Sequence, residues 1–171
     1  LRITVYIAVA LQRSAEDASG RQGAAAPSAL GQALERARGF VRRGLQMQPT
    51  RDPYTLAAER LGAQREALAA QLWALRQEPE GSAGASFLPI SRTPTYGAGL
   101  SARIEGTALA ARLLLRVPQG AARAERALTY LLGAKDALGN WHSTQATIRT
   151  LQALLAFTRS GEPAARGRLR V

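Results

Sequence analysis

Few residues in this 171-residue sequence have types and spacing that could support chemistry. His142, Ser143 and Gln145 follow a Gly139-Asn140 turn dipeptide, and a serine beside a histidine suggests a nucleophile with its base. Adjacent residues do not align in this way without a strained elbow, and no carboxylate stands nearby to orient the histidine. We therefore expect Ser143 or Thr144 to cap the helix that follows, and His142 to be a surface turn residue.

The carboxylates offer a second kind of chemistry. Glu105 precedes an apolar stretch, and a buried glutamate with a raised pKa would be a candidate acid or base. As the third residue of an expected helix, however, Glu105 is better placed to interact with the helix dipole. Asp17, Asp52 and Asp136 are far apart in sequence, and Asp52 directly precedes Pro53, which is a strong helix-start signal. The sequence thus indicates no paired carboxylates.

The composition excludes several classes of site. The chain has no cysteine and a single histidine, so a disulfide, a thiolate metal site and a histidine-based metal site are not expected. A phosphate-binding glycine loop is also missing from the sequence. We predict a non-enzymatic chain without catalytic residues, metal sites or cofactors.

The formal net charge of +11 could indicate nucleic acid or an anionic membrane as a partner. The arginines are instead scattered from Arg2 to Arg170, and the longest adjacent run is Arg42-Arg43. This pattern favours solvated helix faces over a nucleic-acid partner. The longest apolar run, Ile3 to Leu11, is well short of the ~20 residues that span a bilayer, so no membrane span is expected.

Alanine, leucine and arginine dominate the chain, which favours helices between glycine and proline breaks. The expected helices cover residues 1–13, 28–43, 53–61, 63–75, 104–116, 119–132 and 144–157. Residues 78–100 form the longest non-helical segment, which has room for a small hairpin.

Helical spacing predicts which side chains are buried. Leu68, Leu72 and Leu75 should share a buried face, and so should Ile148, Leu151 and Leu155. Trp73 and Trp141 are expected to be core residues rather than ligand platforms.

An internal repeat organises these helices. Four of them are expected to begin near a threonine (Thr4, Thr55, Thr107 and Thr147), and the threonines are 51, 52 and 40 residues apart with one further helix between each pair. Helix pairs that recur in this way form a solenoid or a closed ring. We expect an all-α fold of paired inner and outer helices, an α/α toroid that is a partial ring.

Four blocks of sequence carry a resemblance to a known family. The segment Trp141-His142-Ser143-Thr144-Gln145-Ala146-Thr147 resembles the last helix pair of the thioester-containing domain of α2-macroglobulins and complement components. Thr4 to Leu11, Asp52-Pro53-Tyr54-Thr55 and Glu105-Gly106-Thr107 resemble, in the same order, the family's Thr-Ala-Tyr, Asp-Pro-Tyr and Glu-Thr-Thr helices. The resemblance covers nearly the whole chain and implies an α/α toroid.

The family traps proteases, or tags surfaces covalently, through a Cys–Gln thioester. That thioester lies upstream of the blocks matched here, and this chain has no cysteine. The resemblance therefore implies the C-terminal half of such a domain, with residues 1–163 in the toroid and residues 164–171 leading into a following β domain. His142 stands where relatives carry a small residue and inherits no catalytic role.

The resulting expectation is a structural module of a broad-spectrum endopeptidase inhibitor in the extracellular space, the periplasm or the cell envelope. Its partners would be the remainder of the thioester domain, neighbouring β domains and, through the whole protein, target proteases. Self-association through exposed helix faces is a further expectation. Two alternatives are an α/α-toroid enzyme of the terpene-cyclase type, which would need clustered aspartates, and a basic helical-repeat binding module.

Overall fold

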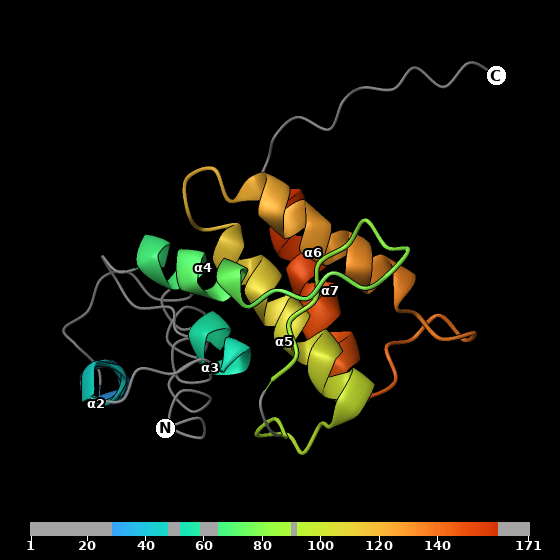
Figure 1. Ribbon diagram of the computed structural model, residues 1–171. Helices are drawn as coiled ribbons and strands as arrows, with labels where there is room; N and C mark the ends of the chain where they lie inside the picture. The colour runs from blue at the N-terminus through green and yellow to red at the C-terminus, as the bar shows by residue number, and fades with distance from the viewer. Residues whose placement is uncertain (1–28, 48–51, 59–64, 90–91, 161–171) are drawn as a thin grey trace.

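The computed structural model describes residues 29–47, 52–58, 65–89 and 92–160 (Figure 1). Regular secondary structure in these ranges consists of α2 (Ala29–Met47), α3 (Pro53–Ala58), α4 (Arg65–Ala74), α5 (Gly99–Leu114), α6 (Ala121–Gly133) and α7 (Thr144–Arg159). The prediction of an all-α fold is confirmed for these residues. The expected helix over residues 1–13, with its Thr4 block, and the exit segment 164–171 lie outside the described residues.

Helix α5 is the centre of the described bundle. It packs against α3, α4, α6 and α7, and in Figure 1 α3 and α4 lie to one side of it and α6 and α7 to the other. Every residue from Ile104 to Ala111 is buried, so α5 is enclosed on all sides over this stretch. A helix that is buried all round is rich in small and apolar residues, which explains the alanines of this segment.

Helix α5 begins earlier than the sequence indicated. We expected it to start near Ile104, but it starts at Gly99, after an extended Ala98. The reason is local, because Leu100, Ser101 and Ala102 contain no helix breaker that would stop the helix from extending back to Gly99. Glu105 and Thr107 consequently lie inside α5 rather than at its start.

The segment after α4 lies across α5 and α6. The hairpin considered for residues 78–100 is reduced to one antiparallel bridge, in which Gln77 and Ser86 exchange two backbone hydrogen bonds of 2.8 Å. Beyond this bridge, the Phe87 N–H donates to Thr107 Oγ1 over 3.0 Å. A Cβ atom on Gly106 would lie 2.6 Å from the Phe87 carbonyl oxygen, so only glycine allows this close approach.

Helices α4 and α6 have the apolar faces expected of them. Leu68 and Leu72 of α4 are buried and Leu75 packs against the same core, as predicted. In α6 the buried residues follow helical spacing, with Ala124, Ala127, Leu128 and Leu131 on one face.

Helix α7 buries a different face from the predicted one. Ile148, Leu151 and Leu155 are 40%, 53% and 49% exposed, whereas Ala146, Arg149, Thr150 and Ala153 are buried. The small side chains among these let the backbone of α7 approach α5 closely. The prediction for this stripe was wrong because hydrophobicity alone does not say which face of a helix meets its neighbour.

Candidate functional site around Glu105

The motif residues in the described part of the chain gather around α5. Tyr54 and Thr55 of α3, and Glu105 and Thr107 of α5, are all buried. Helices α3 and α7 both pack against α5, which brings the three described blocks of the resemblance to one core. Thr144 is exposed, and Gln145 and Thr147 are half-buried at the start of α7.

Asp52 caps α3, as its position before Pro53 predicted. Its carboxylate oxygen Oδ2 accepts a hydrogen bond from the Thr55 backbone N–H over 3.0 Å and another from Thr55 Oγ1 over 2.6 Å. Because Asp52 is buried, these two bonds satisfy a carboxylate that water reaches poorly. Its role is therefore to fix the start of α3.

Glu105 is a buried carboxyl group held by the loop before α5. It is 1% exposed, and its Oε2 accepts a hydrogen bond of 2.8 Å from Thr95 Oγ1. Thr95 Oγ1 in turn lies 2.9 Å from Thr93 Oγ1, which accepts from the Gly97 N–H over 2.9 Å. A Cβ atom on Gly97 would lie 2.6 Å from Glu105 Oε1, so the loop backbone also lies close to the carboxyl group. Glu105 thus anchors the loop to α5.

Burial raises the pKa of Glu105 above its ordinary value, although hydrogen bonds from Thr95 and Thr93 and the nearby Arg149 charge act in the opposite direction. Arg149 is also buried, so α5 and α7 place two ionisable groups within the core. A raised pKa in a cleft would suit an acid or a base. Here the loop covers Glu105, so a substrate could not reach it, and the geometry favours a structural role.

The expected interaction of Glu105 with a helix dipole is wrong. Glu105 is the seventh residue of α5, which is too far from the helix start for the dipole to act strongly on it. Thr107, expected near a helix start, instead donates to the Arg103 carbonyl over 2.7 Å while accepting from the Phe87 N–H.

Trp141 joins the end of α6 to the start of α7. It is buried, its Nε1–H donates to the Leu131 carbonyl over 2.6 Å, and the Lys135 ammonium lies 5.0 Å from the centre of its ring. The Trp141 backbone N–H also donates to Thr147 Oγ1 over 3.3 Å. The core position predicted for Trp141 is confirmed.

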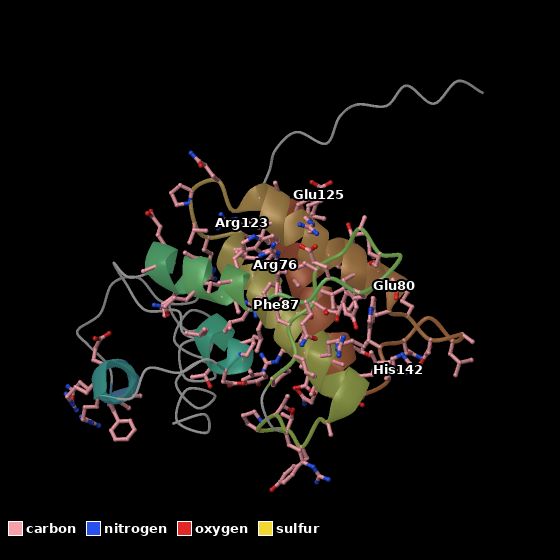
Figure 2. The ribbon with its side chains drawn as sticks, in the orientation of Figure 1. Arg76, Glu80, Phe87, Arg123, Glu125 and His142 are labelled. Atoms are coloured by element: carbon pink, nitrogen blue, oxygen red, sulfur yellow. The ribbon has the colours of Figure 1, made fainter. Side chains whose placement is uncertain are left out.

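The Ser143 region contains the predicted helix cap. Ser143 Oγ accepts from the Ala146 N–H over 3.1 Å, which is the predicted cap of α7. His142 is exposed with φ of 60°, so it lies on a surface turn as predicted, and Figure 2 shows it at the edge of the bundle.

Sequence reasoning missed three residues that organise this region. Thr93 and Thr95 link the loop to Glu105. The Thr-Pro-Thr-Tyr-Gly sequence that contains them is a turn signal, from which the turn in this loop could be predicted. Asp136 builds the turn before Trp141, because its Oδ1 accepts from the backbone N–H groups of Leu138 and Asn140 over 2.9 and 2.8 Å. This Asx-type geometry accounts for the turn that Gly139-Asn140 predicted.

Within the described ranges, no three His, Asp or Glu side chains come together as metal ligands. None of the helices in these ranges has the length and apolarity needed to cross a bilayer. Comparisons with protein-family models, with curated proteins and with solved structures find no match to this chain.

Proposed function

We propose that this chain is a non-enzymatic structural module of an α2-macroglobulin-like protease trap, forming the C-terminal half of a thioester-type α/α toroid. The observation that carries the proposal is the arrangement of the matched blocks. Asp52-Pro53-Tyr54-Thr55 lies at the start of α3, Glu105-Gly106-Thr107 lies within α5, and Ser143 to Thr147 begin α7.

The order of helix contacts supports a ring of paired helices. Helix α5 packs against both α3 and α7 although α4 and α6 separate it from them in sequence, and α4 and α6 each pack against the helices that precede and follow them. Contact of α5 with both its first and its second neighbours along the chain is expected of an inner helix in a layered arrangement.

The use of the aspartates favours this proposal over a toroid enzyme. Asp52 caps α3 and Asp136 organises a turn, so in the described residues neither aspartate belongs to an acidic cluster at a cavity. A cyclase-type acid or metal site would require such a cluster.

The exposed apolar face of α7 supports the expectation of an absent partner. Ile148, Leu151 and Leu155 lie on one side of α7, and Leu132 of α6 is also largely exposed. Apolar residues grouped in this way commonly mark an interface. We assign this face to the remainder of the thioester domain.

The test uses the full product of the reading frame that encodes this chain, after inspection of the region upstream of Leu1 for Cys-x-x-Gln. The product is incubated with several endopeptidases, and hydrolysis of a large protein substrate and of a small peptide substrate is measured. A trap encloses the protease without blocking its active site, so protein hydrolysis should fall while peptide hydrolysis persists.

The 171-residue chain alone is the control, and it should leave both activities unchanged because it lacks the thioester cysteine. Undiminished hydrolysis of protein substrates with every endopeptidase would overturn the proposed function. Equal loss of both activities would indicate active-site inhibition and would also contradict a trap.

A further inference from the structure

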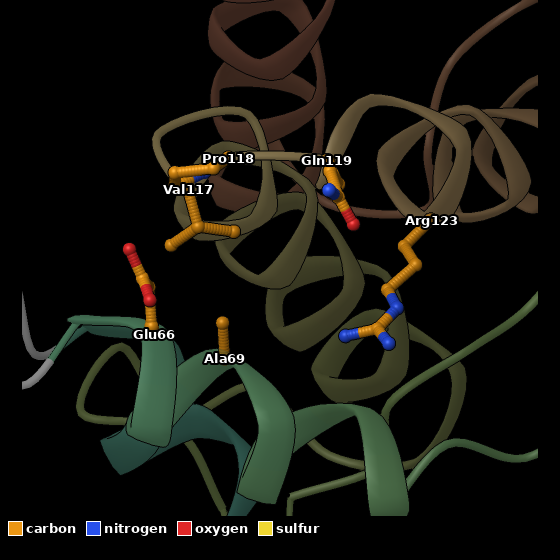
Figure 3. Close-up of a pocket in the computed structure, with 6 residues that line it drawn as sticks. All are labelled: Glu66, Ala69, Val117, Pro118, Gln119 and Arg123. Carbon is orange, nitrogen blue, oxygen red and sulfur yellow. The ribbon is translucent and has the colours of Figure 1, made fainter.

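A pocket of about 310 Å³ lies between α4 and the turn that joins α5 to α6. Figure 3 shows the side chains that line it, namely Glu66, Ala69, Val117, Pro118, Gln119 and Arg123. Its volume is at the lower end of the range for pockets that hold small molecules. The pocket is separate from the Glu105 cluster and from the exposed face of α7.

One end of the pocket carries a positive charge that has no counterion among the described residues. Three guanidinium groups surround the Trp73 ring, with Arg76, Arg123 and Arg126 at 5.0, 5.5 and 5.6 Å from its centre. Glu78 forms ion pairs with Arg76 over 2.8 Å and with Arg126 over 3.0 Å, and its pKa is lowered by them. Within the described residues Arg123 has no such carboxylate partner, and stacking on Trp73 holds it at the pocket wall.

The other end of the pocket carries a negative charge. Figure 3 shows Glu66 extending from α4 toward Val117 and Pro118, while Arg123 extends from α6 toward α4. In the described part of the chain, Glu66 and Arg123 form no ion pair with each other or with another residue. The two charges therefore face the same pocket and are both available to a ligand.

The wall between these charges combines the apolar side chains of Ala69 and Val117 with the polar side chain of Gln119, and its backbone is fixed. Ala69 is buried and Val117 is half-buried. Gln119 has φ of 58°, an uncommon backbone conformation for a residue with a side chain, and Figure 3 shows its amide directed into the pocket. The next residue must be glycine, since a Cβ atom on Gly120 would collide with the Leu114 carbonyl. These two residues therefore fix the path of the turn that forms this side of the pocket.

From this arrangement we propose that the pocket binds a small zwitterion, of the size of a free amino acid, whose ammonium and carboxylate groups are separated by a short apolar chain. The ligand's carboxylate lies on Arg123, where a planar guanidinium can form two parallel hydrogen bonds, and its ammonium group lies on Glu66. The apolar chain between the two groups rests on Ala69 and Val117. A ligand with only one charge leaves the opposite end of the pocket without a partner.

Three probes of one carbon skeleton test this assignment on the unmodified chain. 5-Aminopentanoate has a charge at each end of its chain, pentanoate has only the carboxylate, and pentylamine has only the ammonium group. Binding is followed by the chemical shifts of backbone amides around the pocket during titration. 5-Aminopentanoate should bind at least about tenfold more tightly than either single-charge probe, since a charged hydrogen bond contributes about that factor.

Three variants locate the two contacts. Arg123→Gln should weaken the binding of 5-aminopentanoate and pentanoate by about ten- to a hundredfold and leave that of pentylamine unchanged. Glu66→Gln should weaken the binding of 5-aminopentanoate and pentylamine only. Arg126→Gln is the matched control, because Arg126 also stacks on Trp73 but does not line the pocket. Its affinity for 5-aminopentanoate should equal that of the unmodified chain.

Several results would overturn the proposal. These are the absence of chemical-shift changes around the pocket with any probe at millimolar concentration, equal binding of 5-aminopentanoate and pentanoate, or binding of 5-aminopentanoate that survives both Arg123→Gln and Glu66→Gln. If the Arg123→Gln chain does not fold, two measurements still test the proposal. These are the comparison of the three probes on the unmodified chain and the Glu66→Gln variant, which should fold because the Glu66 side chain is exposed. All of these measurements are independent of protease trapping.

Discussion

The contact between Gly106 and the segment at Phe87 provides a direct test of how α5 is packed. Replacing Gly106 with alanine has two opposing effects on the free energy of unfolding. Alanine in a helix interior is more favourable than glycine by about 1 kcal/mol. The added methyl group, however, would lie 2.6 Å from the Phe87 carbonyl oxygen and 3.3 Å from the Pro89 ring.

The steric term should exceed the gain in helix propensity because the opposing atoms cannot move away easily. Phe87 is fully buried, its N–H is bonded to Thr107, and the Ala85 N–H donates to the Arg126 carbonyl over 2.9 Å. Overpacking a fixed site costs about 1–3 kcal/mol, and we take the upper part of that range. The expected net loss for Gly106→Ala is about 1–2 kcal/mol, which corresponds to about 2–8 °C in Tm for a chain of this length.

The assay is urea unfolding followed by far-ultraviolet circular dichroism and by the fluorescence of Trp73 and Trp141. Gly133→Ala is the matched control, because Gly133 ends α6 and a Cβ atom there would contact nothing within 4 Å. This control should be neutral or more stable by about 0.5 kcal/mol. A Gly106→Ala chain as stable as the unmodified one, with an unchanged m-value, would refute the reasoning about this contact.

Three further predictions concern the core and the surface. Trp141→Phe removes the hydrogen bond to the Leu131 carbonyl and part of a buried ring, so urea unfolding should show a loss of about 2–3 kcal/mol. Glu105→Gln should gain stability relative to the unmodified chain as pH rises above 4.5, measured by thermal unfolding across pH, because the raised pKa makes the charged form of Glu105 unfavourable in the folded state. A chain that carries both Leu151→Gln and Leu155→Gln should self-associate less in sedimentation velocity. Both side chains are about half exposed on α7, and in the isolated chain this apolar face lacks the partner that we assign to it.

Each of these predictions has a distinct contradictory result. Full stability of Trp141→Phe would show that the indole does not hold α6 to α7. A stability difference for Glu105→Gln that stays constant with pH would contradict the direction of the pKa shift, since a group with a raised pKa contributes most below its unfolded pKa and loses that contribution as pH rises. Leu100→Gln, on α5 and also exposed, is the control for the α7 pair, and equal effects at both sites would argue against an α7 interface.

The sequence by itself determined the local features of this protein. The Ser143 cap, the turn at Gly139-Asn140 and the Asp52-Pro53 helix start were all predicted, because each depends on hydrogen bonds between residues only a few positions apart. The all-α composition of the described residues follows from the same local preferences.

Only the tertiary structure decided which faces and which distant residues meet. Burial of Arg149 and exposure of Leu151 on α7 depend on what packs against that helix. The face of α7 that carries mostly small residues is buried, and the stripe of larger apolar residues is exposed. The enclosure of Glu105 required the loop carrying Thr95, and the pocket required Glu66 and Arg123 to come from different helices. Such contacts join residues far apart in the chain, and helical periodicity contains no information about them.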